Sequence, residues 1–184
     1  MKTRFYIVRH GQTLFNLQGK IQGWSDSPLT EKGFEQAEKM AKKLDDIHFD
    51  LGISSSSERA RDTMYTIVNG RFPCSFYKDL KEICFGTLEG DSVQTIIGSQ
   101  RTDWREFGGE TFDEARIRVE KCLISISKEV KDGHVLVVSH GAVLREFIHH
   151  LNPDFYDIMP NCSMFIVDCV DGKLELSSLP EVII

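Results

Sequence analysis

Apolar residues occur along this chain in short unbroken runs separated by longer, more polar stretches. The runs are rich in β-branched and aromatic side chains, which is typical of strands buried on both faces. They lie at residues 3–8, 50–54 and 74–77 and in the segment that ends at Val138. Residues 30–44 place apolar side chains at helical spacing, with Thr30 as the expected N-cap. A last pair of runs, on either side of Asp171 and Gly172, predicts a hairpin.

Two further helices are predicted by the residues that begin them. Ser55 and Glu58 have the spacing of a capping box. A helix is therefore expected to begin there, with Arg59 in its first turn. Thr111 and Glu114 repeat the spacing at the start of a second, longer helix.

The alternation of strands and helices predicts an α/β fold, with a mostly parallel central sheet and helices on both of its faces. The 184 residues contain no internal repeat and no linker rich in Pro, Gly or Ser, so one domain is expected to span 1–184. The least regular span, residues 91–109, is expected to form a short lid-like insertion. In sheets of this kind, ligands bind outside the carboxyl ends of the strands.

Polar residues stand at two of these strand ends. Val8 is followed directly by Arg9 and His10, and Val138 is followed by Ser139 and His140 before the next helix. A buried strand gains nothing from a cation and an imidazole at its end, whereas a ligand site would use both. The sequence therefore predicts a site at this edge of the sheet.

Composition limits what such a site can bind. The net charge is −6 and no basic run or basic-aromatic stripe is present, which argues against a nucleic-acid partner. Five cysteines without a CxxC pair fit unpaired thiols in a reducing compartment, and no segment approaches the length of a membrane span. We expect a cytoplasmic protein without a membrane partner. The histidines, cysteines and carboxylates show no metal-ligand spacing, so neither a metal site nor a cofactor is expected.

A series of motifs follows in order along the chain: "RHGQT" with Asn16 behind it, "QGWSDSPLTEKG", "SSSERARDT", "LKEICFGTLEG", "GGETFDEARIRV" and "VVSHGAVLR". In this order and on these expected elements they resemble the histidine phosphatase superfamily, the phosphoglycerate-mutase-like proteins. The resemblance spans nearly the whole chain and implies a three-layer α/β sandwich with a phosphate pocket. It also implies the chemistry, in which a histidine takes up a phosphoryl group and water later removes it.

The resemblance implies catalytic roles for five residues. His10 is the expected nucleophile, and His140 is the second histidine, which faces it and binds phosphate. Arg9 and Arg59 are the expected cationic donors, because guanidinium groups match the geometry of phosphate oxygens. Glu82 precedes a Phe-Gly pair and is the expected general acid, which protonates the leaving oxygen and then activates water.

Other positions are expected to support these roles. Glu89 is close to Glu82 in the sequence and is the competing candidate for the general acid. Besides Arg9, Arg59 and His140, the expected substrate-binding residues are Asn16, Gln22, Gly23 and Gly141. The residues expected on helix surfaces, at caps or behind the site are Arg61, Arg145, His48, His134, His149 and His150.

The length of the cover over the site separates two activities within the family. Phosphoglycerate mutases carry a longer insertion between the acid glutamate and the "GGE" segment, whereas only 27 residues lie between Glu82 and Glu110 here. An open phosphohistidine meets water. We therefore expect a metal-independent phosphoric monoester hydrolase acting on a small phosphorylated metabolite, such as a sugar or nucleoside-like monophosphate.

Some alternatives stay open at this point. Mutase-type phosphoryl transfer and a catalytically silent phosphate-binding module are the alternative functions. Trp104 and Phe107 are expected either to stack on the substrate or to anchor the lid. The sequence does not decide between a monomer and a homodimer.

Overall fold

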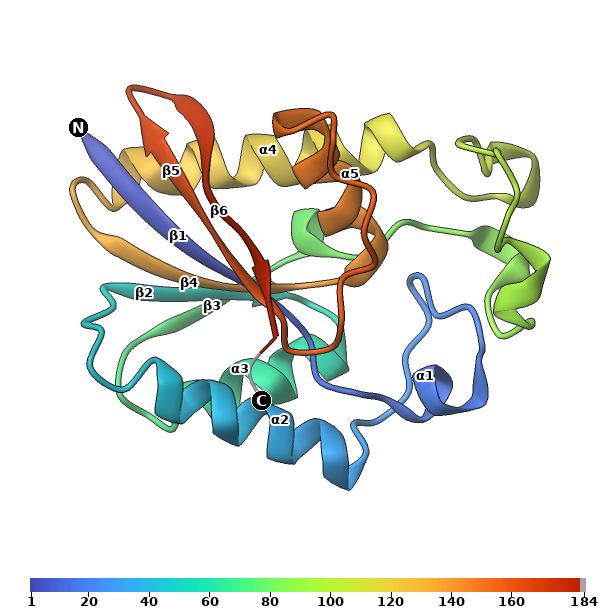
Figure 1. Cartoon of the computed structure of the whole chain (residues 1–184), viewed down its shortest axis with the longest axis horizontal. Coiled ribbons are helices and arrows are strands. Elements are labelled where there is room, and N and C mark those ends of the chain that lie inside the picture. The colour runs from blue at the N-terminus through green and yellow to red at the C-terminus, as the bar shows by residue number, and fades with distance from the viewer. Residues whose placement is uncertain (183–184) are drawn as a thin grey trace.

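A six-stranded sheet runs through the centre of the computed structural model, which describes residues 1–182 (Figure 1). The strands are β1 (Lys2–Arg9), β2 (Leu51–Ser55), β3 (Cys74–Tyr77), β4 (His134–Ser139), β5 (Met164–Val170) and β6 (Lys173–Glu181). Their order is β3-β2-β4-β1-β5-β6, in which the first four run parallel to one another, β5 pairs antiparallel with β1, and β6 pairs antiparallel with β5. The antiparallel edge is the expected hairpin, and Asp171 and Gly172 turn it with φ of 50° and 83°. The predicted mostly parallel sheet is confirmed.

Helices cover both faces of the sheet (Figure 1). One face carries α2 (Glu31–Lys43) and α3 (Glu58–Val68), and the other carries α4 (Phe112–Glu129) and α5 (Gly141–Leu151). Because side chains alternate along a strand, β1 sends Phe5 and Ile7 into the core beneath α4 and α5, and Tyr6 and Val8 into the core beneath α2 and α3. Burial on both faces explains why the apolar run is unbroken.

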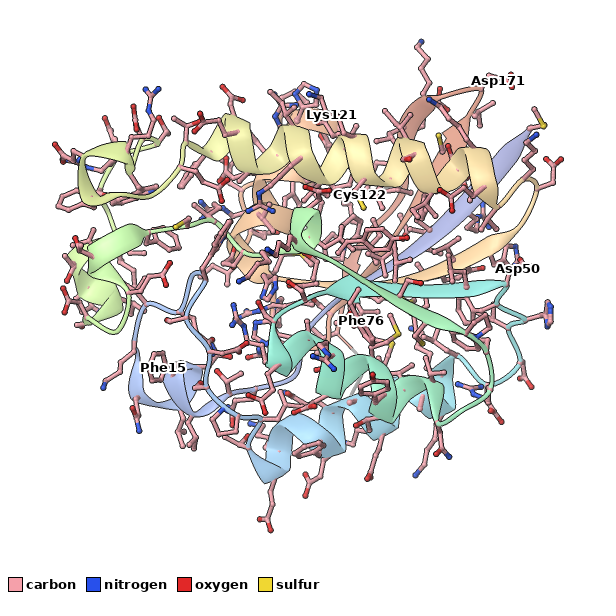
Figure 2. The ribbon with its side chains drawn as sticks, turned by 180° about the vertical axis from the view of Figure 1, so that it is seen from behind. Phe15, Asp50, Phe76, Lys121, Cys122 and Asp171 are labelled. Carbon is pink, nitrogen blue, oxygen red and sulfur yellow. The ribbon has the colours of Figure 1, made fainter. Side chains whose placement is uncertain are left out.

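Each helix turns one apolar side toward the sheet. In α4, Figure 2 shows Lys121 at the outer side and Cys122 on the side of the sheet, and Cys122 is only 6 % exposed.

Among residues 1–182, no helix combines the length and the apolar character that a membrane crossing needs.

Two helix starts follow the prediction and one does not. Thr111 and Glu114 form the expected capping box of α4, and the Thr30 side chain accepts a hydrogen bond from the backbone of α2. The capping box expected at Ser55 is wrong, because Ser55 ends β2 and α3 begins at Glu58. A carboxylate from another loop replaces it: Asp26 Oδ2 accepts the backbone N–H of Glu58 at 2.5 Å.

Three connecting segments gather at the carboxyl ends of the parallel strands (Figure 1). The loop after β1 contains a short helix that was not predicted, α1 (Leu14–Gln18), and the loop after α5 spans residues 152–163. The irregular span 91–109 contains two short 3-10 helices, η3 (Val93–Thr95) and η4 (Arg105–Phe107).

Trp104 anchors the irregular span to the body of the protein. Its side chain is 3 % exposed and lies edge-to-face on Phe85, with 5.2 Å between ring centroids. Phe107 packs against the same indole at 6.5 Å. Of the two roles expected for Trp104 and Phe107, the structure supports the anchoring role.

Candidate active site

A cavity of about 300 Å³ opens where β1 and β4 end. It lies among the loop after β1, the irregular span 91–109 and the loop after α5. All the predicted site residues except His140 line it: Arg9, His10, Asn16, Gln22, Gly23, Arg59, Glu82 and Gly141. His140 is fully buried and lies against His10, with their ring centroids 5.1 Å apart. The fold therefore brings together residues that are up to 132 positions apart in the chain (141 − 9).

The ring of His10 is held with one nitrogen free. Nδ1 lies 2.7 Å from the carbonyl oxygen of Gly11, so the neutral ring donates its N–H there and keeps the lone pair on Nε2. His10 is only 3 % exposed. Burial lowers its pKa well below 6.5, and the positive charges of Arg59 and Arg9 lower it further. A neutral imidazole with a free Nε2 is the form that a nucleophilic histidine needs.

His140 stands at the N-cap of α5 without a hydrogen-bond partner. Both of its ring nitrogens are buried and unpaired among the described residues. Its pKa is lowered well below 6.5 by burial and then by the charge of Arg59. Buried polar groups are almost always hydrogen-bonded, so two unpaired nitrogens beside a cavity indicate a place that a ligand completes.

Arg9 is packed against the start of α5. Its Nη1 donates to the carbonyl of Met159, whereas its Nε is buried without a partner within residues 1–182. A Cβ added at Gly141 would lie 3.0 Å from this Nε. Gly141 therefore leaves room for the guanidinium group, and a larger residue would displace it.

Arg59 is the largest fully buried side chain of the protein's core. Its Nη1 donates to the carbonyl of Ser25 at 2.9 Å and to Asp26 Oδ1 at 2.8 Å, and its Nη2 donates to the carbonyl of Gly23 at 2.8 Å. Its Nε has no partner in the described part of the chain. A buried charge with an unused N–H is costly unless an anion binds there. Arg9 and Arg59 thus place two buried positive charges with unused N–H donors beside the cavity.

The carboxylate of Glu82 caps helix α5 from another loop. Oε1 accepts the backbone N–H groups of Ile83 at 2.9 Å and Val143 at 2.8 Å, and Oε2 accepts that of Ala142 at 2.9 Å. These bonds fix the carboxyl group beside the cavity. Oε2 accepts one bond and Oε1 two, so Oε2 keeps the capacity to carry a proton.

Glu89, the competing carboxylate, does not line the cavity. Its oxygens accept the backbone N–H groups of Trp24 at 2.8 Å, Ser25 at 2.7 Å and Phe85 at 3.1 Å. It also packs against Gly23, where φ is +55° and an added Cβ would lie 2.1 Å from Glu89 Oε1. Glu89 therefore shapes the loop, and the geometry favours Glu82 as the acid.

The two side-chain amides expected to bind phosphate, those of Gln22 and Asn16, differ in whether a hydrogen-bond donor is still free. Gln22 is already engaged, because Oε1 accepts from the Thr13 hydroxyl at 3.1 Å and Nε2 donates to the Ser27 hydroxyl at 2.9 Å. Asn16 Oδ1 accepts from Asn161 Nδ2 at 3.1 Å. The Asn16 amino group has no partner within residues 1–182, so Asn16 is the better donor to a ligand.

Two polar residues that sequence reasoning missed fix the backbone around His10. Thr63 Oγ1 accepts the N–H of Gly11 at 3.0 Å and donates to the carbonyl of Arg59 at 2.8 Å. Asn161 Nδ2 donates to the carbonyl of His10 at 3.1 Å. Thr63 is the last residue of the motif "SSSERARDT", whereas Asn161 lies outside every quoted motif. Neither was singled out, because both act through contacts made only in the fold.

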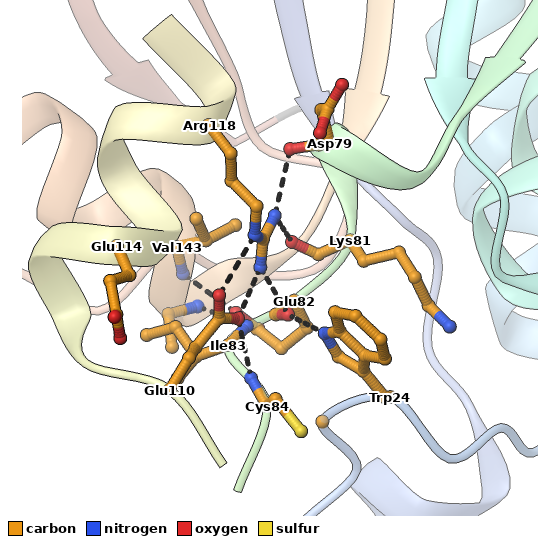
Figure 3. A network of polar contacts seen from close by, with 12 residues as sticks. Trp24, Asp79, Lys81, Glu82, Ile83, Cys84, Glu110, Glu114, Arg118 and Val143 are labelled. Atoms are coloured by element: carbon orange, nitrogen blue, oxygen red, sulfur yellow. Dashed lines mark hydrogen bonds and ion pairs between the residues drawn. The ribbon is translucent and has the colours of Figure 1, made fainter. Parts of the chain in front are cut away.

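A third missed element, Arg118 of α4, holds the segment that carries Glu82 (Figure 3). Its Nη1 donates to the carbonyls of Asp79 at 2.8 Å and Lys81 at 2.6 Å. Its Nη2 donates to the carbonyl of Glu82 at 2.8 Å and to Glu110 Oε1 at 2.6 Å. Three carbonyl contacts, at residues 79, 81 and 82, thus fix the backbone of residues 79–82.

Arg118→Met is expected to lower the free energy of unfolding by about 3 kcal/mol, because it removes the charge that pairs with Glu110 and the donor to three carbonyls. Of these carbonyls, that of Glu82 keeps one other donor, the Trp24 indole N–H. Urea denaturation measures this change. Arg101→Met is the matched control, since Arg101 pairs with Glu106 at the surface, where its side chain is 41 % exposed, and should cost less than about 1 kcal/mol. Equal losses in the two variants would contradict the bracing role of Arg118.

Charged residues at the mouth of the cavity differ from expectation. Arg145, expected on the helix surface or behind the site, lines the cavity together with Lys20. Its Nε and Nη2 both donate to Glu146 Oε1.

The histidines outside the motifs (His48, His134, His149 and His150) do not line the cavity, as expected. Within residues 1–182, no three His, Cys, Asp or Glu residues are grouped so that they could hold a metal ion.

The fold and the cavity define a class of α/β proteins with a pair of histidines and two arginines at the strand ends. Residues 5–181 match the sequence profile of the histidine phosphatase superfamily (branch 1), and the chain belongs to this superfamily. Among its relatives, the metal-independent phosphoserine phosphatase of Arabidopsis thaliana is 31 % identical over 98 % of this chain and 82 % of its own length. The adenosylcobalamin/α-ribazole phosphatase of Escherichia coli (strain K12) is 31 % identical over 80 % and 78 %, respectively.

A solved structure agrees with these relatives. Phosphoglycerate mutase from Bacillus anthracis (strain Sterne) superimposes with a TM-score of 0.88 and 28 % identity, covering 97 % of this chain and 92 % of that one. The comparisons confirm the predicted family, the fold class and the enzyme class, a phosphoric monoester hydrolase.

Proposed function

We propose that this protein hydrolyses the phosphomonoester of a small metabolite, without a metal ion, through a phosphohistidine at His10. One observation carries the proposal: a neutral histidine with a free Nε2 shares a cavity with two buried guanidinium groups that have unused donors. Cationic donors meet the charge that develops on phosphoryl oxygens, which a metal ion meets in other enzymes. The names of two relatives, a metal-independent phosphoserine phosphatase and an α-ribazole phosphatase, support the same reading.

The reaction proceeds in two phosphoryl transfers. In the first, His10 Nε2 forms a bond to phosphorus while the bond to the ester oxygen breaks, and Glu82 Oε2 gives its proton to that oxygen. Arg9, Arg59 and His140 donate hydrogen bonds to the phosphoryl oxygens. In the second, Glu82 accepts a proton from a water molecule that attacks phosphorus, the N–P bond breaks, and phosphate leaves.

The short cover supports hydrolysis over transfer to a second substrate. The 27 residues between Glu82 and Glu110 include the irregular span and add no strand and only short 3-10 helices. Water reaches a phosphohistidine more readily under such a cover than under a long closed one. The fold does not decide this point, because the similar solved structure is a phosphoglycerate mutase.

The test is to incubate the protein, in a buffer that contains EDTA, with 3-phosphoglycerate and a trace of 2,3-bisphosphoglycerate, and separately with p-nitrophenyl phosphate. We expect p-nitrophenyl phosphate to be hydrolysed at an unchanged rate after chelation, and phosphate release from 3-phosphoglycerate to exceed formation of 2-phosphoglycerate. Rapid isomerisation would identify a mutase. Failure to hydrolyse any phosphomonoester would identify the silent binding module.

The cysteines bear on where this reaction takes place. All five are free thiols, and burial raises the pKa of Cys122 and Cys162 to about 12, so these two are poorly reactive. Unpaired thiols persist in reducing compartments. This supports the expected cytoplasmic location.

A further inference from the structure

The cavity has two parts of opposite character. Its floor is polar and holds the catalytic residues, whereas the wall above the floor is built mainly from aliphatic side chains. These are Ile21 from the first loop, Val93, Ile96 and Ile97 from the irregular span, and Ile158 and Met159 from the loop after α5. The alcohol part of a bound phosphomonoester has to lie against this wall, because its phosphate occupies the floor.

Two of the wall residues are exposed to water in a way that a folded protein usually avoids. Ile97 is 61 % exposed and Ile158 is 79 % exposed, and both line the same cavity mouth from different segments. Apolar side chains gathered at one opening mark a binding surface rather than scattered surface residues. A ligand that covers them removes apolar area from water, which stabilises the complex.

The wall lacks the groups that a polar alcohol would need. Within residues 1–182, Glu82 is the only carboxylate in the cavity lining, and its oxygens already accept three backbone N–H groups. The described lining therefore offers no further acidic side chain to pair with a substrate amine. The polar side chains of the outer lining are those of Asn16, Lys20 and Arg145. Asn16 is the expected donor to the phosphate, and the other two are cations at the rim. A site built for sugar hydroxyls would instead leave several of them unpaired here, at a cost in affinity.

We propose that the substrate is a monophosphate ester of a predominantly apolar alcohol, with an alkyl or aryl body of about six carbons or more next to the ester oxygen. This inference rests on the proposed phosphatase function and narrows its substrate class away from sugar phosphates. The apolar body lies between the irregular span and the loop after α5, and Ile97 and Ile158 contact it from opposite sides of the mouth.

The first experiment uses n-alkyl phosphates from ethyl to hexyl, because their leaving oxygens are chemically alike and only the apolar length changes. We expect kcat/KM to rise roughly two- to fourfold for each added methylene. Hexitol 6-phosphate has the same six-carbon skeleton, but each carbon that does not carry the phosphate bears a hydroxyl group. We expect its kcat/KM to be at least about tenfold lower than that of hexyl phosphate. A value independent of chain length, or a preference for the hexitol ester, would overturn the inference.

The second experiment locates the effect on the wall. Ile97→Ser and Ile158→Ser should each reduce the ratio of kcat/KM for hexyl phosphate to kcat/KM for ethyl phosphate several-fold. Leu17→Ser is the matched control, because Leu17 is 67 % exposed but does not line the cavity. The high exposure of all three side chains keeps these variants folded, which a thermal melt checks. An unchanged gain in both wall variants would also overturn the inference.

The outcomes separate this inference from the proposed function. If ethyl and p-nitrophenyl phosphates are hydrolysed but the alkyl series is flat, the enzyme is a phosphatase whose substrate body is not apolar. If no phosphomonoester is hydrolysed by the wild-type protein, the phosphatase function itself fails.

Discussion

His10→Ala is expected to lower the turnover of every phosphomonoester by roughly 10⁴-fold or more, because no neighbouring group can replace the nucleophile. The other histidine of the site, His140, is fully buried with its ring 5.1 Å from that of His10, and its proposed role is to bind phosphate, not to attack it. Acid-labile label from a ³²P-substrate should be trapped on the wild-type protein and absent from the variant. An adduct that survives His10→Ala would overturn the assignment.

A control and a pH profile sharpen this prediction. His150→Ala is the matched histidine control, since His150 is half exposed and lies 3.8 Å from Glu120, away from the cavity. It should keep full activity and full labelling. Because the pKa of His10 is lowered, its neutral form persists at pH values where an ordinary histidine is largely protonated. Labelling should therefore continue as the pH falls below 6.5, and a loss of labelling centred at 6.5 would contradict the buried, neutral nucleophile.

Glu82→Gln is expected to have the second largest effect, and one that depends on the substrate. Glutamine keeps the size of the side chain but has no carboxyl proton to give, so hydrolysis of an alkyl phosphate should slow by roughly 10²- to 10⁴-fold. Nitrophenolate leaves without a proton, so p-nitrophenyl phosphate should form the phosphohistidine at a nearly normal rate. Because the same residue activates water, the intermediate should then accumulate and give a burst of nitrophenol before a slow steady state.

Two controls separate chemistry from structure in this experiment. Glutamine places an amino group where one carboxylate oxygen of Glu82 accepts a backbone N–H, so a loss of about 1 kcal/mol in the free energy of unfolding is expected. Denaturation measures whether the variant stays folded. Glu89→Gln tests the competing carboxylate and should slow both substrates alike, through the loop that it shapes. Equal losses for both substrates in Glu82→Gln, without a burst, would contradict its role as general acid.

Local sequence patterns predicted the parts of this protein that depend on neighbours in the chain. Three features could be predicted because each is determined by residues a few positions apart. They are the unbroken apolar run of β1, the Thr111–Glu114 capping box and the turn at Asp171. Because the carboxyl ends of parallel strands lie at one edge of a sheet, the sequence also predicts that Arg9 and His140 lie at the same edge. Their particular roles came from the resemblance to a family.

What the sequence left unpredicted depends on contacts between distant segments. Asp26 replaces Ser55 as the cap of α3 because the two loops meet in the fold. Arg118 lies in the motif "GGETFDEARIRV" but was given no role there, and only the fold shows that it donates to the carbonyls of residues 79, 81 and 82. The apolar wall of the cavity was missed for another reason: Val93 and Ile97 lie in a span without strand or helix periodicity, so no pattern indicated which side chains face inward.

The hydrogen bonds between Glu82 and the start of α5 also bear on where a phosphate group can bind. The start of a helix attracts anions, since its first N–H groups are free and the helix dipole is positive there. At α5 this attraction is already satisfied, because the glutamate occupies the N–H groups of Ala142 and Val143. We therefore expect phosphate to bind at the two arginines, within reach of His10, and not at the start of the helix. Removal of the Glu82 carboxyl group would free these N–H groups and give the phosphate product a second place to bind.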